Sequence, residues 1–374
     1  MVNSGAAPKN LRAPWPFRSN GFVGALDGIA DRVVRGGAAP ACAVGCAALG
    51  RRGWAEETGG ADEAIFDLAS VTKPMTALAI ARAGLRRRRL GELLPELSPS
   101  PLGAATLEDL LSHRVGLVDH LPLYLPVVVG ESVDQDEALG RIAGSLREGL
   151  AWPPPHGGHP PVYSDLGYIL AGVALARAMD VEDAGAAIER LVVARLDALD
   201  ELGTIRGLAG RGVDLERVQP TEDVPWRGGV VRGAVHDENA WALTGTGGSG
   251  HAGMFGAVGA VVRFGEAVAL ALRGEGPLAA GDVGAWLVAA RPGGSLAAGF
   301  DRKSEPSSAG TVCGPETVGH LGFTGTSLWI DLEAGAVVAV LSNRVHPTRN
   351  NARIRELRPE VHDALFRRAA RSRV

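Results

Sequence analysis

Lysine is almost absent from this chain, which contains three lysines against 35 arginines. Arginine serves wherever only a positive charge or a bidentate ion pair is needed, and here it occupies nearly every basic position. An ammonium group can lose its proton inside a protein, whereas a guanidinium effectively cannot. A lysine kept among so many arginines therefore indicates a position where a proton must be given up, and Lys73 is the lysine whose neighbours support this interpretation.

Three further scarcities exclude classes of protein. No apolar run approaches the length of a membrane-spanning helix, and residues 1–20 contain no signal-like apolar stretch, so a cytoplasmic protein is expected. The net charge of −4 gives no reason to expect nucleic acid or an anionic membrane as a partner. The three cysteines cannot all pair, and Cys42 and Cys46 face the same way in an expected strand, so packing of reduced thiols in a core is expected.

Apolar residues follow strand-like spacing at both ends of the chain and helical spacing between them. Strands are expected at 41–49, 53–58, 317–323, 327–331 and 337–341. Helices are expected at 26–34, 70–83, from 106 onward, and at 134–147, 165–178, 184–199, 258–273, 280–290 and 351–370. This pattern predicts an α/β protein of the α+β type, in which both chain ends form one antiparallel sheet flanked by helices and a helical lobe is inserted between them.

The same distribution predicts a single domain at 21–374, preceded by an N-terminal extension at 1–20. Within the domain, a sheet subdomain is expected at about 21–69 and 240–374, and a helical subdomain at about 70–239. The helical part would then interrupt the sheet part in sequence without forming a separate domain.

Lys73 lies three residues after Ser70, at the start of the helix expected at 70–83. In a helix this spacing places the hydroxyl and the amine one turn apart on the same face. That geometry is typical of a serine nucleophile with lysine as its base. The alternative is an ordinary helix N-terminus, in which a hydroxyl caps the helix and Lys73 is solvated.

Two other short segments carry candidate site residues. In the first, a loop rich in proline and glycine runs into a helix, so Tyr163 and Asp165 lie at a turn, although Ser164 or Asp165 could simply cap that helix. In the second, His320 lies between closely spaced glycines of a strand-like run, which is typical of a strand whose backbone is closely approached. A lone histidine is more often structural, but the flanking glycines favour a site.

Three motifs in order, Ser70-Val71-Thr72-Lys73, Tyr163-Ser164-Asp165 and His320-Leu321-Gly322, resemble those of the serine β-lactamase and penicillin-binding protein superfamily. The resemblance is to the branch of class C β-lactamases, D-aminopeptidases and related esterases, and it runs from about 21 to 366. It extends to a turn and to serine-hydrolase-like segments at 110–117, 235–240 and 250–255. One such motif would be a weak signal, whereas three in family-like order and spacing are a specific one.

The resemblance implies acyl transfer through a covalent intermediate, with no metal or cofactor. Ser70 would attack the carbonyl, while Lys73 and Tyr163 share the proton transfers. Asp165 would hold Lys73 in place, and His320 would face the leaving group or the polar end of the substrate.

The resemblance also implies how the substrate is held. The backbone amides of Ser70 and Phe323 would form an oxyanion hole. The residues beside the Phe323 amide, Gly322 and Thr324, would contact the substrate. The implied partner is a small ester, amide or β-lactam.

Two positions depart from the family pattern. Asp165 stands where the family usually has asparagine, and a carboxylate there favours the ammonium form of Lys73, which shifts proton work to Tyr163. In His320-Leu321-Gly322 the family's threonine hydroxyl is absent, which weakens recognition of a substrate carboxylate. Both changes favour a hydrolase of small esters or amides over a β-lactamase.

Two other functions stay open. One is a metal-dependent hydrolase that uses His236, Asp237 and His251, with His156 and His159 as further ligands, although no His-Glu-x-x-His pattern accompanies them. The other is a catalytically inactive, penicillin-binding-like ligand sensor, because a fold does not determine a function. Resistance of hydrolysis to chelators would exclude the first, and labelling by a fluorophosphonate would exclude the second.

Overall fold

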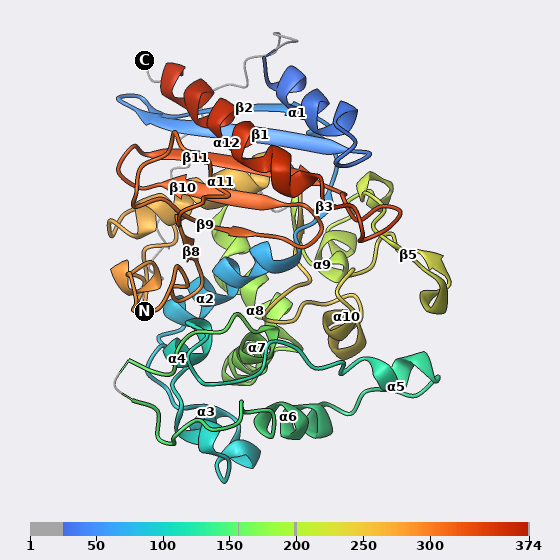
Figure 1. Ribbon diagram of the computed structural model, residues 1–374, viewed down its shortest axis with the longest axis vertical. Helices are drawn as coiled ribbons and strands as arrows, with labels where there is room; N and C mark the ends of the chain where they lie inside the picture. Colours follow the sequence, from blue (N-terminus) through green and yellow to red (C-terminus); the bar gives the residue numbers. More distant parts are fainter. Residues whose placement is uncertain (1–24, 156, 198–199, 373–374) are drawn as a thin grey trace, which may run out of the picture.

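The computed structural model describes residues 25–155, 157–197 and 200–372, and its centre is a six-stranded antiparallel sheet (Figure 1). The strand order is β2 (Gly53–Gly60), β1 (Cys42–Gly50), β11 (Ala336–Ser342), β10 (Ser327–Asp331), β9 (Val318–Leu321) and β8 (Asp301–Arg302). The two ends of the chain meet where β1 pairs with β11, in a register that sets Cys42 opposite Ser342. The structure confirms the expected α+β class, with one antiparallel sheet built from both chain ends.

Helices cover both faces of this sheet (Figure 1). α1 (Ala25–Arg35) and α12 (Ile354–Arg371) pack on one face, and α11 (Val258–Ala271) packs on the other. All three helices lie where the sequence pattern predicts them, because each carries an apolar face at helical spacing. The sheet is therefore the middle layer of the molecule.

Side chains of the central strands alternate between two cores. Cys42 and Cys46 point into the core beneath α1 and α12, whereas Ala43 and Ala47 point into the larger core on the opposite face. Both thiols are buried and unpaired, as is that of Cys313. The expected packing role of Cys42 and Cys46 is confirmed.

Most of the helices between the two halves of the sheet pack against the large core, but Ile205, Leu208 and Ala240 are buried in a smaller core and the helix at 125–128 buries no residue. Figure 1 shows how these helices are arranged. They are α2 (Thr72–Arg82), α3 (Leu90–Leu93), α4 (Leu107–Leu111), α5 (Leu125–Val128), α6 (Gln135–Ala143), α7 (Asp165–Met179), α8 (Ala184–Leu191), α9 (Ile205–Gly210) and α10 (Glu238–Thr244). Thr106 begins α4 through a capping box with Asp109, as its position in the sequence indicates. α2 and α7 contact each other within this core, which brings two of the predicted motifs together.

The prediction of a helix at 280–290 is wrong. That segment holds only one short 3₁₀ turn, Ala285–Leu287. Its backbone is used elsewhere, because the Asp282 N–H donates to the Ala81 carbonyl in α2. A contact between residues so distant in sequence leaves no trace in local periodicity.

Two other helices are shorter than expected. α6 ends at Ala143, and the Arg147 N–H beyond it donates to the carbonyl of Gly116. α8 ends at Leu191, and positions 198–199 of the predicted helix lie outside the described residues. After α8 the chain continues in a 3₁₀ turn, Val193–Arg195. In both cases the helical spacing of apolar residues continues past the end of the α-helix.

Two short sheets complete the fold. One consists of β3 (Phe66–Asp67), β7 (Phe255–Gly256) and β4 (Leu202–Gly203), and the other of β5 (Asp223–Val224) and β6 (Gly229–Val230). Strands of two residues are too short to be seen in a sequence pattern. β3 is important for the site because it leads directly into the turn that carries Ser70.

Within the described ranges, none of the helices has the length and apolar content needed to cross a bilayer.

Candidate active site

Ser70 lies in a single 3₁₀ turn, Ala69–Val71, between β3 and α2. Ala69 has a φ of 46°, in the left-handed region that residues other than glycine rarely adopt. The buried carboxylate of Asp67 stabilises this turn by accepting the Ala69 N–H at 2.8 Å and the His236 N–H at 2.7 Å. The strained turn is thus fixed by a residue three positions before the serine, which the sequence pattern did not single out.

Lys73 is fully buried in the first turn of α2. Its Nζ donates to Ser70 Oγ at 2.8 Å and to Asp165 Oδ1 at 2.7 Å. Burial has the largest single effect on the ammonium pKa and lowers it, but Asp165 and Tyr163 together outweigh burial, so the pKa of Lys73 is raised. The solvated-lysine alternative is therefore wrong, because this side chain faces the serine and a carboxylate.

Asp165 is the first residue of α7, and it does not cap the helix. The cap is Ser164, whose hydroxyl accepts the Leu166 N–H at 3.2 Å. The Asp165 carboxylate is left to accept from Lys73, and this ion pair overcomes the effect of burial and lowers the pKa of Asp165. Both partners of the pair are therefore held in their charged forms.

The Tyr163 ring contacts both Lys73 and His113. The Lys73 Nζ lies 4.8 Å from the ring centroid, and the His113 ring stacks on the tyrosine ring with centroids 4.9 Å apart. Burial raises the pKa of the tyrosine hydroxyl, although its interactions with Lys73 and Ser70 act in the opposite direction. One part of Tyr163 stays open to solvent, since the residue is 39% exposed.

His113 supports this tyrosine, and sequence reasoning gave it no role. It is buried with a φ of 58°, and its Nδ1 accepts the Ser164 N–H at 3.1 Å. Burial, with Lys73 as a second cause, lowers the pKa of His113 to about 3, so the ring is neutral. The family-like turn at 110–117 was the sequence signal that could have pointed to His113. The contact of His113 with Tyr163, however, joins residues 50 positions apart and depends on the tertiary fold.

His320 lies on β9, with its ring centroid 6.0 Å from that of Tyr163. Burial is the main reason that its pKa is lowered to about 3, and Lys73 adds to the effect. The neutral ring must donate from Nδ1 to the Leu321 carbonyl, 2.8 Å away, because a carbonyl only accepts. Nε2 is then an acceptor, so His320 offers the site a lone pair and no positive charge.

The turn after β9 is attached to the segment that precedes Ser70. Thr324 Oγ1 donates to the Asp67 carbonyl at 2.7 Å, and Thr326 Oγ1 donates to the Leu68 carbonyl at 2.9 Å. The Thr324 side chain is thus buried and bonded within the protein, which differs from the substrate contact expected for it. Its hydroxyl instead fixes the Phe323 backbone relative to the serine.

Gly322 and Phe323 form the rest of this turn. A Cβ on Gly322 would overlap Thr326 Oγ1 and lie 2.6 Å from the Leu68 carbonyl oxygen, so only glycine allows the approach. Among the described residues, no carbonyl accepts a hydrogen bond from the backbone N–H of Phe323 or of Ser70. The amides of Ser70 and Phe323 therefore have no backbone acceptor among the residues that the structure describes, and the two segments that carry them are hydrogen-bonded to each other beside the serine.

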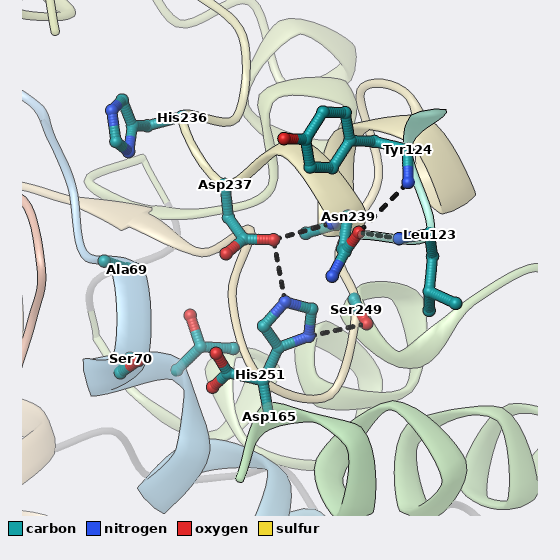
Figure 2. A network of polar contacts seen from close by, with 12 residues as sticks. Ala69, Ser70, Leu123, Tyr124, Asp165, His236, Asp237, Asn239, Ser249 and His251 are labelled. Atoms are coloured by element: carbon teal, nitrogen blue, oxygen red, sulfur yellow. Dashed lines mark hydrogen bonds and ion pairs between the residues drawn. The ribbon is translucent and has the colours of Figure 1, made fainter. Parts of the chain in front are cut away.

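The residues of the metal alternative are divided between separate contacts. His236 Nε2 pairs with Glu222 Oε2 at 3.0 Å. His251 Nε2 pairs instead with Asp237 Oδ1 at 2.8 Å (Figure 2). His159 packs against Trp152, and His156 lies outside the described residues. In the described part of the chain no three such side chains gather as metal ligands.

The fold and the sequence place the chain in a known family. A family model described as Beta-lactamase matches residues 26–362, and the chain belongs to that family. No curated protein matched the sequence.

Solved structures show the same fold at low sequence identity. A class C β-lactamase from Rhodobacter sphaeroides superimposes with a TM-score of 0.63 at 18% identity, covering 92% of this chain and 99% of that one. EstCE1, a hydrolase with promiscuous acyltransferase activity, gives a TM-score of 0.64 at 19% identity, covering 91% and 97%. A mutant of simvastatin synthase from Aspergillus terreus gives 0.61 at 16% identity, covering 92% and 98%.

Proposed function

We propose that this protein is a serine hydrolase that cleaves small esters or amides through an acyl-enzyme. The observation that carries the proposal is the 2.8 Å contact between Ser70 Oγ and the buried Lys73 Nζ. A hydroxyl is a weak nucleophile until a base takes its proton, and this lysine is the nearest candidate base. The Tyr163 ring lies 4.8 Å from Lys73 Nζ, and its hydroxyl interacts electrostatically with Lys73 and Ser70, which supports a proton route through Tyr163.

The reaction divides into two steps. Ser70 Oγ attacks the substrate carbonyl while its proton passes to neutral Lys73, directly or through Tyr163, and the oxyanion accepts from the amides of Ser70 and Phe323. The proton then passes to the leaving alcohol or amine as its bond to carbon breaks. Water next attacks the acyl-enzyme, gives up a proton to the same base, and releases the acid as Ser70 recovers its hydrogen.

His320 carries no positive charge, which supports the proposal that the substrates lack a carboxylate. Two arginines stack on Phe323, but both are bonded elsewhere. Arg344 donates to three backbone carbonyls, and Arg349 is paired with Glu222 and Glu238. With these cations committed, an uncharged ester or amide is favoured over a β-lactam or a D-amino-acid peptide, whose carboxylates need a partner.

Fluorophosphonate labelling and a substrate panel test the proposal. We expect mass spectrometry to locate one adduct on Ser70, and p-nitrophenyl esters to turn over faster than a chromogenic cephalosporin or D-alanyl anilides. An unlabelled Ser70 would support the ligand-sensor alternative, and loss of hydrolysis with a chelator would support the metal alternative. A cephalosporin turned over faster than the esters would contradict the proposed substrate class.

Replacing Asp165 with asparagine should move the alkaline-rising limb of the acylation profile to lower pH. The carboxylate raises the pKa of Lys73, so its removal lets the neutral, competent lysine form at lower pH. Asparagine also cannot disturb the helix cap, because Ser164 provides it. The test is the rate of acylation by one activated ester, measured across pH for the wild type and for Asp165→Asn. Superimposable profiles would remove Asp165 from the catalytic set.

Replacing Gly322 with alanine should lower the free energy of unfolding by about 1–3 kcal/mol and slow acylation. The added methyl group overlaps Thr326 Oγ1 and must displace the turn that carries the Phe323 amide. Gly140→Ala in α6 is the matched control, because nothing lies within 4 Å of its added Cβ. Urea denaturation and acylation kinetics measure both effects, and a Gly322→Ala variant as stable and active as Gly140→Ala would show that the close approach is unimportant.

A further inference from the structure

Asp237 and His251 form a carboxylate–histidine pair that lies close to Asp165 (Figure 2). His251 is buried, with Nε2 2.8 Å from Asp237 Oδ1 and Nδ1 3.1 Å from Ser249 Oγ. The backbone carbonyl of the same histidine lies 3.5 Å from Lys73 Nζ. His251 therefore joins the candidate base on one side to a second carboxylate on the other.

The loop that carries His251 is bonded to the helices that carry the candidate base and its carboxylate. Thr76 Oγ1 of α2 donates to the Gly250 carbonyl at 2.7 Å. On the α7 side, a Cβ on Gly250 would overlap the Tyr168 carbonyl oxygen, so the loop lies directly against that helix. The position of the His251 carbonyl is thus tied to both Lys73 and Asp165.

Asp237 is held by the start of α10. Its Oδ1 caps the helix by accepting the Ala240 N–H at 2.8 Å. Burial opposes its ionisation, but His251 and this amide outweigh burial and lower the pKa of Asp237. In the first turn of α10 the Asn239 side chain accepts from the Leu123 N–H at 2.8 Å and from the Tyr124 N–H at 3.1 Å, which fixes the helix start further (Figure 2).

The hydrogen bonds assign the proton of His251. Ser249 is buried, and among the described residues the partner of its hydroxyl is His251 Nδ1. A buried hydroxyl hydrogen needs an acceptor, so Ser249 donates to Nδ1 and the ring keeps its proton on Nε2, where it donates to Asp237. The ring is then neutral, and the Asp237–His251 pair contributes one net negative charge.

We propose, on the basis of the serine hydrolase function above, that Asp237 and His251 are positioning residues for Lys73. His251 orients the carbonyl that faces the ammonium, and the Asp237 carboxylate adds to the negative charge that keeps Lys73 protonated in the resting enzyme. The charged or titratable groups around the pair are Asp67, Lys73, Asp165, Arg227 and His236.

Two variants separate charge from orientation. Asp237→Asn keeps a capping side chain and removes the charge, so the alkaline-rising limb of p-nitrophenyl acetate acylation should move to lower pH by about half a unit. His251→Gln leaves the net charge unchanged, because the ring is neutral, and removes the orienting contact. Its acylation rate should fall roughly tenfold at every pH with the midpoint unmoved.

Asp134→Asn is the matched control, because Asp134 caps α6 through the Glu137 N–H and lies outside the site. Its profile should match the wild type, and a shift there would assign the effect to helix capping and overturn the inference. A wild-type profile for Asp237→Asn would overturn it as well. A move to higher pH in His251→Gln, with Asp237→Asn unmoved, would show that the ring carries a positive charge and would also overturn it.

These outcomes are distinct from failure of the proposed function, in which the wild-type protein itself would not acquire a label on Ser70. If Asp237→Asn does not fold, as judged by circular dichroism, Asp237→Ser retains a capping hydroxyl and removes the same charge. The same shift to lower pH is expected of it, and its absence would contradict the inference.

Discussion

Replacing Ser70 with alanine is expected to reduce ester hydrolysis by a factor on the order of 10⁴ or more, with no acyl-enzyme formed. The hydroxyl is the atom that becomes bonded to the acyl group, and neither Lys73 nor Tyr163 can replace it. The change removes one oxygen from a turn that Asp67 holds through backbone amides, so the fold should be retained. Initial rates with a p-nitrophenyl ester and intact-protein mass spectrometry measure the two losses.

The control for this prediction is Ser100→Ala, which removes the hydroxyl that caps a short 3₁₀ helix at Pro101–Ala104. Its labelling and turnover should equal those of the wild type. A folded Ser70→Ala protein that kept more than a small part of the activity would assign the nucleophile to another residue.

Replacing Lys73 with arginine should be nearly as damaging as replacing it with alanine, with a loss on the order of 10³-fold in the acylation rate. Arginine keeps the positive charge, and so preserves the attraction to Asp165, but it cannot take up the serine proton at neutral pH. The larger guanidinium must also fit where Lys73 is fully buried. Pre-steady-state acylation by one activated ester, compared among wild type, Lys73→Arg and Lys73→Ala, measures the effect.

Lys303→Arg is the matched control, because Lys303 donates to the Cys313 carbonyl and needs only a hydrogen-bond donor. It should acylate at the wild-type rate. Near-normal activity of Lys73→Arg would mean that the lysine acts only through its charge, and the assignment of Lys73 as the base would be wrong.

Local patterns were sufficient for five strands of the central sheet and for the first motif, whereas the two-residue strand Asp301–Arg302 was not predicted. Strands 327–331 and 337–341 are apolar runs bounded by turn residues, and they recur in the structure within a residue at each end. Ser70 lies in the 3₁₀ turn that leads into the first turn of α2, where Lys73 lies, so their contact follows from a spacing of three along consecutive helical turns. Structural features that depend on a few neighbouring residues could therefore be predicted directly from the sequence.

The rest of the candidate site depends on contacts across the chain. Asp165 reaches Lys73 over a separation of 92 residues, and Thr324 reaches Asp67 over 257. Resemblance to a family brought these segments to notice, but their distances, and the inward direction of the Thr324 hydroxyl, required coordinates. Asp237 and His251 likewise became a pair with a role only when the loop was found against α2 and α7.

The sequence by itself determined which residue types are available for the chemistry: a serine and a lysine at helical spacing in a chain that otherwise uses arginine, within an α+β framework. The tertiary structure decided how they are charged. Burial acts to lower the pKa of Lys73, His113 and His320, and of these three only Lys73 has a carboxylate at 2.7 Å that reverses the effect. Desolvation and charge–charge interactions depend on distances in space, which no spacing along the chain specifies.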